Sequence, residues 1–232
     1  MPSEDGSDFD TRYDPDSDFD RWQAIAVARC VVPFIRPGDQ VLELGCAKGY
    51  MTGLFVNQGA KVTAIDFSPV FLEVAKTRVL SGVDWIQEDL NNWKSNGEYH
   101  HVILSRTLHF VREPKTLIAE SARSLLPGGL LHVAVPNPRS IHRIVGSVMG
   151  VISDLGSCKW NKERPLPSVD DVVRMAQDAG LSLMFRAGRM LKPLPADLMD
   201  ELPDKLIEGF ISAEVYLPEY AAVNHFLFAK AK

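Results

Sequence analysis

Short apolar segments alternate with stretches of helical periodicity along most of this 232-residue chain. The apolar segments that predict strands are 41–44, 61–66, 83–88, 101–105, 130–135, 181–187 and 222–230. Helical spacing of apolar residues predicts helices over 21–35, 50–58, 69–79, 114–126 and 168–179. This alternation predicts an α/β fold, in which a sheet carries helices on both faces.

Capping residues and turn residues sharpen two of the helix boundaries. Ser68 is predicted to cap the helix that begins at Pro69, and Pro127-Gly128-Gly129 is predicted to end helix 114–126. The buried stripe of helix 69–79 is expected to consist of Val70, Phe71, Val74, Ala75 and Val79.

Two long insertions interrupt the regular alternation, at about 137–167 and 191–217. Irregular segments of this length are uncommon in compact domains and often form lids or binding loops. We therefore expect one domain over 21–232 with a cap built from both insertions. Residues 1–20 hold eight acidic residues and one basic residue, so this segment is expected to be partly mobile.

The first predicted strand runs directly into a turn of small residues. The sequence VLELGCAKGY covers 41–50, and Gly45, Ala47 and Gly49 allow the backbone to turn tightly and to approach a ligand. A helix that starts near Gly49 would point its free N–H groups at that ligand. The pattern predicts a nucleotide-type binding turn.

The acidic residues around this turn narrow the choice of ligand. A dinucleotide fingerprint requires a third glycine for helix packing, but bulky Tyr50 occupies that position. Glu43 places a carboxylate two residues before Gly45, which disfavours a diphosphate and favours a cationic or zwitterionic ligand. Asp66 ends the second strand, where it can accept hydrogen bonds from ribose hydroxyls, and Asp89 follows the third strand, near a purine edge.

Four sequence segments together resemble the class I, Rossmann-like, S-adenosylmethionine-dependent methyltransferases of the small-molecule type. They are VLELGCAKG at 41–49, AIDFSP at 64–69, QEDLNNW at 87–93 and SLLPGGLLHVAVPN at 124–137. The resemblance covers about 39–136. It implies a doubly wound, seven-stranded mixed sheet whose last strand lies antiparallel between strands five and six. It also implies S-adenosylmethionine as cofactor and S-adenosylhomocysteine as product.

The resemblance also implies roles for individual residues. Glu43 would bind the methionine amino group, Asp66 the ribose, and Asp89 with Leu90 the adenine. The full set of expected cofactor-binding residues is Tyr13, Glu43, Gly45, Cys46, Ala47, Gly49, Asp66, Phe67, Asp89, Leu90 and Ser105.

Two histidines are candidates for a general base that removes the proton of an acceptor. His109 follows the fourth strand, and His142 lies in segment 137–143, which is similar to a segment of methyltransferases that act on sugars and related metabolites. A structural role for His109 is the alternative. His132 lies within a predicted strand and is expected to be a core or edge residue. Because no H-x-E or H-x-x-x-H spacing occurs, no metal is expected.

Composition excludes several classes of function. The net charge is −5, and no basic run with interleaved aromatic residues suggests a nucleic-acid partner. No apolar run reaches the roughly 20 residues that cross a bilayer, so no membrane partner is expected. The three cysteines form no C-x-x-C pair, which favours the reducing cytoplasm. A homodimer is an option that the sequence leaves open.

The predicted function is methyl transfer from S-adenosylmethionine to a small molecule of the sugar or secondary-metabolite type, as in a biosynthetic pathway. The fourth strand is not followed by an Asn-Pro-Pro-Tyr-like sequence, which argues against methylation of a nucleobase or a glutamine and leaves O-, N- and C-methylation open. The alternatives are a nicotinamide-dependent oxidoreductase, against which Tyr50 and Glu43 count, and a non-catalytic cofactor-binding partner protein.

Overall fold

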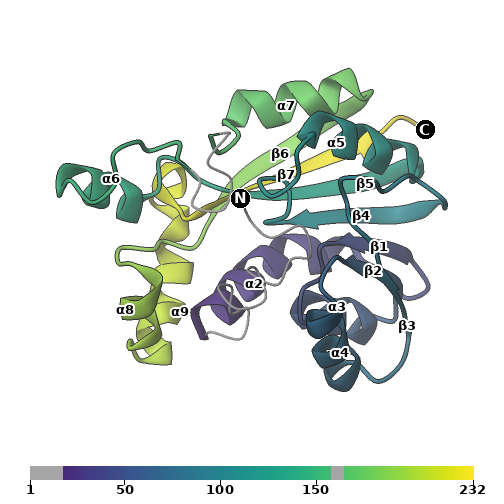
Figure 1. Ribbon diagram of the computed structural model, residues 1–232, viewed down its shortest axis with the longest axis horizontal. Coiled ribbons are helices and arrows are strands. Elements are labelled where there is room, and N and C mark those ends of the chain that lie inside the picture. The colour runs from purple at the N-terminus through teal and green to yellow at the C-terminus, as the bar shows by residue number, and fades with distance from the viewer. Residues whose placement is uncertain (1–17, 158–164) are drawn as a thin grey trace.

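A seven-stranded sheet forms the centre of the computed structural model, which describes residues 18–157 and 165–232 (Figure 1). The strand order is β3-β2-β1-β4-β5-β7-β6. The strands are β1 (Gln40–Leu44), β2 (Lys61–Asp66), β3 (Val83–Gln87), β4 (Tyr99–Ser105), β5 (Leu125–Pro136), β6 (Leu181–Arg189) and β7 (Val223–Lys230). Helices cover both faces of the sheet, which confirms the predicted fold class.

Parallel pairing brings the carboxyl ends of most strands to one edge of the sheet. β1 pairs in parallel with β2 and β4, β2 with β3, and β4 with β5. β7 is antiparallel to both β5 and β6, as the resemblance implied. Because β1 lies between β2 and β4, the chain reverses its direction of crossing at this point, which is where open α/β sheets bind their ligands.

The helices are α2 (Asp18–Val31), α3 (Tyr50–Asn57), α4 (Pro69–Arg78), α5 (Pro114–Arg123), α6 (Ile141–Val148), α7 (Val169–Asp178), α8 (Ala196–Asp200) and α9 (Asp204–Ser212), with 3-10 turns η1 (Val32–Phe34), η2 (Ala213–Val215) and η3 (Pro218–Tyr220). The five predicted helices correspond to α2, α3, α4, α5 and α7, with shifts at their ends, whereas α6, α8 and α9 lie within the two insertions. The predicted Ser68 cap is confirmed, since its Oγ accepts a hydrogen bond from the Phe71 N–H at 3.1 Å.

Two local predictions are wrong. Val70 is 54% exposed, whereas Leu72 is buried, because the buried stripe of α4 is centred on Phe71, Leu72 and Ala75 and each residue turns the helix by about 100°. Helix α5 ends at Arg123 rather than at 126, since Leu125 pairs with β4 as the first residue of β5. The register between β4 and β5 then shifts: Tyr99 pairs with Leu125, whereas His101 pairs with Leu130, so segment 127–129 lies at an irregularity in the pairing.

Both faces of the sheet are closed by apolar cores. One core packs the sheet against α5 and α7, and it includes Leu104, Ile118, Val172 and Phe226. The other packs the sheet against α2, α3 and α4 and includes Phe55. These two cores cover the faces of the sheet and leave the carboxyl edge of the strands available for a site.

The two insertions form helical segments at that carboxyl edge (Figure 1). The first contains α6, and the second contains α8, α9 and η2. An apolar cluster that includes Trp22, Met190, Met199 and Ile211 packs the second insertion against α2. Arg189 also forms a partly buried ion pair with Glu214 of η2. No helix within 18–157 or 165–232 is long and apolar enough to cross a membrane.

Three buried histidines form a row on one face of β4, β5 and β7. The Nδ1 atom of His101 lies 3.4 Å from the Nε2 atom of His132, and the ring of His132 lies 5.7 Å from that of His225. Asp39 lies at one end of the row, with Oδ2 3.2 Å from the Nε2 atom of His101. Desolvation by burial lowers the pKa of all three rings, so each is neutral at pH 7. The expected structural role of His132 agrees with this burial.

Acidification should destabilise the fold through these rings. Burial, with a smaller effect of Arg189, lowers the pKa of His225 to about 3, whereas the unfolded chain binds this proton near pH 6.5. The stability contributed by the neutral ring is therefore complete above about pH 6.5 and is lost as the pH falls towards 3. The loss is about 1.4 kcal/mol per pH unit for each such group. Arg36, His100, Asp39 and Arg189 are the charged or titratable neighbours that modulate the row.

Urea unfolding between pH 7.5 and pH 5 measures this loss. As the pH is lowered, the free energy of unfolding should fall steeply in the wild-type protein and less steeply in His225→Leu, which removes one titrating ring. An identical slope in the variant would show that His225 does not contribute.

Candidate functional site

Acidic side chains lie at the carboxyl ends of the first three strands. Glu43 lies one residue before the end of β1, Asp66 is the last residue of β2, and Asp89 follows β3. Ser105 ends β4, the neighbour of β1 on the other side. Because these strands are parallel neighbours, the structure brings the four predicted positions to one edge of the sheet.

In the turn after β1, every second residue from Gly45 to Gly49 has a left-handed backbone conformation. The φ angles are 82° at Gly45, 47° at Ala47 and 75° at Gly49. Ala47 adopts this region although it carries a Cβ atom, which is unfavourable for residues other than glycine. The N–H groups of Gly45 and Cys46 both donate to the carbonyl of Ile65, at 2.8 and 3.0 Å. The turn is therefore fastened to the end of β2.

Asp66 holds the same turn through its side chain. Its Oδ2 atom accepts a hydrogen bond from the Ala47 N–H at 2.8 Å, and its Oδ1 atom accepts one from the Ser68 N–H at 3.0 Å. A carboxylate has about four lone-pair positions, so it can still accept bonds from a ligand. The residue predicted to bind ribose thus also orders the turn and the start of α4.

Glu43 is almost completely buried next to this turn. Its Oε2 atom accepts a hydrogen bond from the Thr52 hydroxyl at 2.6 Å. Desolvation by burial raises the pKa of Glu43 to about 8; the Thr52 bond lowers it and the charge of Asp66 raises it. Glu43 is therefore largely protonated at pH 7, and a cationic group beside it would favour the carboxylate form. Sequence reasoning missed Thr52, which gave no signal beyond that of a helical residue.

The remaining residues of the turn region differ in exposure. Cys46 is buried, and burial raises the pKa of its thiol, so it is a neutral lining residue. Phe67 is 38% exposed and presents an aromatic surface beside Asp66. Gly49 packs closely against α4, since a Cβ atom there would lie 3.0 Å from that of Ala75. The region combines an open aromatic surface with a closely packed backbone.

Asp89 shapes the loop that follows β3. Its Oδ1 atom accepts hydrogen bonds from the Asn91 N–H at 2.9 Å and from the Asn91 Nδ2 at 2.8 Å. Asn91 in turn accepts a bond from the Arg112 N–H at 2.7 Å. Leu90, the residue after Asp89, is buried in the apolar core and so anchors the loop to the body of the domain.

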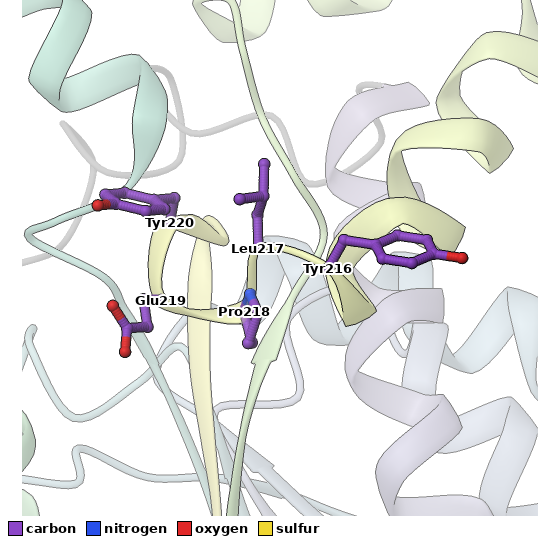
Figure 2. Close-up of a pocket in the computed structure, with 5 residues that line it drawn as sticks. All are labelled: Tyr216, Leu217, Pro218, Glu219 and Tyr220. Atoms are coloured by element: carbon purple, nitrogen blue, oxygen red, sulfur yellow. The ribbon is translucent and has the colours of Figure 1, made fainter.

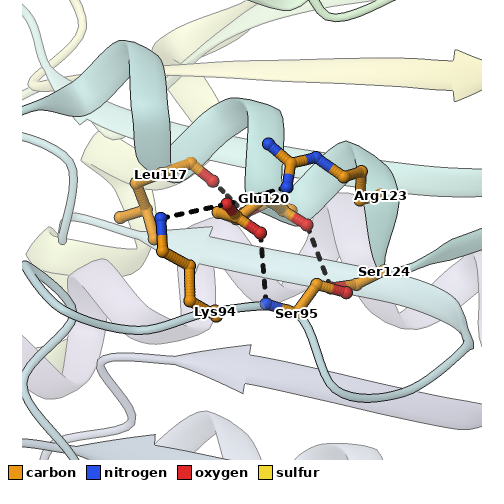
Figure 3. Close-up of polar contacts among 7 residues, drawn as sticks. Lys94, Ser95, Leu117, Glu120, Arg123 and Ser124 are labelled. Carbon is orange, nitrogen blue, oxygen red and sulfur yellow. Dashed lines mark hydrogen bonds and ion pairs between the residues drawn. The ribbon is translucent and has the colours of Figure 1, made fainter.

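A buried carboxylate in α5 anchors the far end of this loop (Figure 3). The Glu120 side chain accepts the Ser95 N–H at 3.2 Å and binds Lys94 at 3.3 Å and Arg123 at 2.9 Å. Ser124 donates to the Ser95 hydroxyl at 2.8 Å. Glu120 is 25 residues from Ser95 in sequence, so no local pattern predicted this contact.

His109 lies in the loop after β4, against Phe110, with ring centroids 4.1 Å apart. Its Nδ1 atom is buried and has no hydrogen-bond partner among the residues that the structure describes. Burial, with a smaller effect of Arg106, lowers the pKa of His109 to about 3. The ring is therefore neutral at pH 7.

His142 lies on α6, in the first insertion, and its ring forms a hydrogen bond with the backbone of Lys192 in the second. Burial and the charges of Lys192 and Arg143 lower the pKa of His142 to about 3. The two insertions are thus connected through this ring. Tyr13 lies outside the described residues. Within those residues, no group of three His, Cys, Asp or Glu side chains could hold a metal ion.

A hollow of about 300 Å³ lies elsewhere, along segment 216–220 (Figure 2). It is lined by Tyr216, Leu217, Pro218, Glu219 and Tyr220, and the two tyrosine rings point in opposite directions. None of the predicted site residues lines it. The candidate site is therefore the carboxyl edge of β1, β2, β3 and β4.

Known proteins share this sequence pattern and this fold. Residues 41–129 match a family described as "Methyltransferase domain". Trans-aconitate 2-methyltransferase of Azoarcus sp. (strain BH72) is 26% identical over 185 residues, which are 70% of this chain and 73% of that protein. Ubiquinone biosynthesis O-methyltransferase of Xanthomonas campestris pv. campestris (strain B100) is 31% identical over 106 residues, only 44% of either chain.

A solved structure supports the fold over nearly the whole chain. The S-adenosylmethionine-dependent methyltransferase of Mesorhizobium loti superposes with a TM-score of 0.65 at 15% identity. The match covers 91% of this chain and 100% of that one. The predicted fold is therefore shared with the Mesorhizobium loti methyltransferase.

The variant Asp66→Asn should loosen the turn after β1. The amide keeps the size of the carboxylate but has only one acceptor oxygen, so it can accept only one of the two backbone N–H groups. We expect hydrogen exchange at least about tenfold faster for 45–49 or for 67–72, since a lost bond costs about 1–3 kcal/mol locally. Exchange mass spectrometry measures this, with exposed Asp84→Asn as the matched control. Wild-type exchange in both peptides would contradict the role of Asp66 in ordering the turn.

Proposed function

We propose that this chain, which belongs to the class I S-adenosylmethionine-dependent methyltransferases, transfers the methyl group of S-adenosylmethionine to a small-molecule acceptor. The observation that supports this most is that Glu43, Asp66 and Asp89 lie at or just after the carboxyl ends of β1, β2 and β3, next to a turn with left-handed backbone at Gly45, Ala47 and Gly49. Carboxylates at these positions suit a ligand with a positive charge and a ribose, and they disfavour a diphosphate.

The cofactor would lie across the ends of β1, β2 and β3. In this arrangement Glu43 would face the ammonium group of the methionine part, and the turn from Gly45 through Cys46 and Ala47 to Gly49 would admit the cofactor closely. Asp66 and Phe67 would hold the ribose, and Asp89 and Leu90 would contact the adenine. Ser105 would line the side near β4, and Tyr13 would bind the methionine carboxylate.

Methyl transfer from the sulfonium is an in-line displacement. When bound, S-adenosylmethionine would supply a methyl group on a sulfonium: a lone pair of the acceptor would form the new bond to the methyl carbon, and the electrons of the broken carbon–sulfur bond would go to sulfur, which leaves S-adenosylhomocysteine. Because the donor is already activated, alignment of donor and acceptor contributes most of what the protein must supply. Where the acceptor is a hydroxyl, its proton must also leave, and His109 or His142 would accept it.

The acceptor is a small metabolite in this proposal, with sugar and secondary-metabolite scaffolds as the favoured class. The names of the relatives, which refer to trans-aconitate and to ubiquinone biosynthesis, support a small molecule. Insertions 137–167 and 191–217 would cap the acceptor within a single domain that spans 21–232. The buried, unpaired Cys30 and Cys46 are consistent with the reducing cytoplasm.

Ligand binding tests the proposal directly. S-adenosylhomocysteine should raise the melting temperature, whereas a nicotinamide dinucleotide should not, and Asp66→Ala should weaken S-adenosylhomocysteine binding at least about tenfold by calorimetry because ribose contacts are lost. Incubation with labelled S-adenosylmethionine and a panel of hydroxylated and aminated metabolites would then identify the acceptor by mass gain. Stabilisation by the dinucleotide alone would overturn the proposal.

The variant His109→Ala should reduce turnover about a hundredfold if His109 is the general base. Since the pKa of His109 is about 3, its protonation state does not change between pH 5 and 8, and no step in the rate near pH 6.5 should arise from it. The matched control is His100→Ala, on the opposite edge of the sheet at the start of β4. Full activity of His109→Ala would show that the residue only packs the loop.

A further inference from the structure

Thr107 connects the loop after β4 to the end of β1. Its side chain is buried, and its Oγ1 atom donates a hydrogen bond to the carbonyl of Leu44 at 2.9 Å, with the carbonyl of Ser105 at 3.2 Å as a second acceptor. Leu44 is the last residue before the glycine turn. A side chain 63 residues away in sequence therefore fixes the point at which β1 enters the turn.

The backbone around Thr107 keeps its side chain directed inward. Arg106 has a left-handed φ angle of 59°, and its N–H donates to the carbonyl of Ala134 in β5 at 2.7 Å. The N–H of Phe110 donates to the carbonyl of Thr107 at 2.9 Å and closes the loop. A non-glycine residue in this region is unfavourable, so the surrounding contacts must determine the conformation.

Gly45 and Thr107 are complementary in shape. A Cβ atom added to Gly45 would lie 2.4 Å from the Oγ1 atom of Thr107 and 2.8 Å from its Cγ2 atom. Thr107 thus occupies the space that a side chain at position 45 would need. Glycine is required there because of this contact as well as because of its φ angle of 82°.

The turn is therefore held on both sides. On the β2 side, the carbonyl of Ile65 and the carboxylate of Asp66 accept its N–H groups. On the β4 side, the Thr107 hydroxyl donates to the carbonyl of Leu44, the residue that leads into the turn. Thr107 also belongs to segment 105–110, which carries Ser105 and His109.

We propose that Thr107 is the positioning residue that holds the cofactor-binding turn in register with the loop beside the reacting methyl group. This inference rests on the proposed function, since it concerns the cofactor of that reaction. Thr107 acts through Leu44 and Gly45 and need not touch the cofactor. Loss of its hydroxyl should disturb the turn that admits the cofactor even when the fold remains intact.

Three variants separate positioning from general stability. Thr107→Val keeps the size of the side chain but removes the hydroxyl that donates to the Leu44 carbonyl, and Thr107→Ser keeps this donor. The matched control is Ser121→Ala, since Ser121 is also buried and donates to a main-chain carbonyl, that of Leu117, at 2.7 Å, but it lies in α5. The readouts are the dissociation constant of S-adenosylhomocysteine by calorimetry and the melting temperature.

Thr107→Val should bind S-adenosylhomocysteine about tenfold more weakly than the wild type, whereas Thr107→Ser should remain within about twofold. Ser121→Ala should lower the melting temperature without a change in affinity. Wild-type affinity in Thr107→Val, or equal weakening in Thr107→Ser, would overturn the proposal. If the wild-type protein itself does not bind the ligand, the proposed function fails. Hydrogen exchange of 44–49 in the free protein then decides for Thr107, and it should be faster in Thr107→Val.

A double substitution tests the steric part. The melting temperature of Gly45→Ala should be low, and that of Gly45→Ala with Thr107→Ala should be higher, because the second change removes the two closest contacting atoms. The double variant could instead melt at the same temperature as Gly45→Ala or below it. That result would show that the Thr107 side chain is not what excludes a larger residue at position 45.

Discussion

The hydrogen bond from the Ala47 N–H to the Asp66 carboxylate holds the turn on which the candidate site depends. A left-handed backbone is unfavourable for alanine by about 1–2 kcal/mol, and a hydrogen bond to a charged group contributes about 1.5–3 kcal/mol. The bond is thus large enough to offset the strain. Since Asp66 ends β2, the position of that strand directly sets the shape of the turn after β1. The sheet, rather than the glycines alone, determines the site.

The charges at this edge favour one kind of ligand. Burial, with a smaller effect of the charge of Asp66, raises the pKa of Glu43 to about 8, so a second negative charge beside Asp66 is unfavourable and Glu43 is largely protonated at pH 7. A diphosphate would bring further negative charge beside Asp66, whereas a sulfonium or an ammonium group would stabilise the carboxylate form of Glu43. The protonation of Glu43 near neutral pH also means that binding of a cation is coupled to release of a proton.

Sequence alone located those parts of the fold that depend on local patterns. The bounds of β2 and the Ser68 cap follow from apolar runs and capping residues, and the acidic strand ends follow from their order along the chain. The antiparallel last strand came from the resemblance to a family. Contacts between distant segments could not be predicted: Leu125 joins β5 because it pairs with Tyr99, and Glu120 and Thr107 bond to partners 25 and 63 residues away. No periodicity carries information on such register.

The state of the two candidate bases shows what this site can contribute to the reaction. Burial keeps His109 and His142 neutral at pH 7, so either ring has the free lone pair that a base requires. The same burial makes the protonated ring unfavourable, so either histidine would be a weak base for removing a proton from the acceptor. The activated sulfonium needs little help from a base, whereas it needs close alignment with the acceptor. The hydrogen bonds that Ile65, Asp66 and Thr107 make fix the strand ends and the turn, and in the proposed reaction this fixed geometry would supply that alignment.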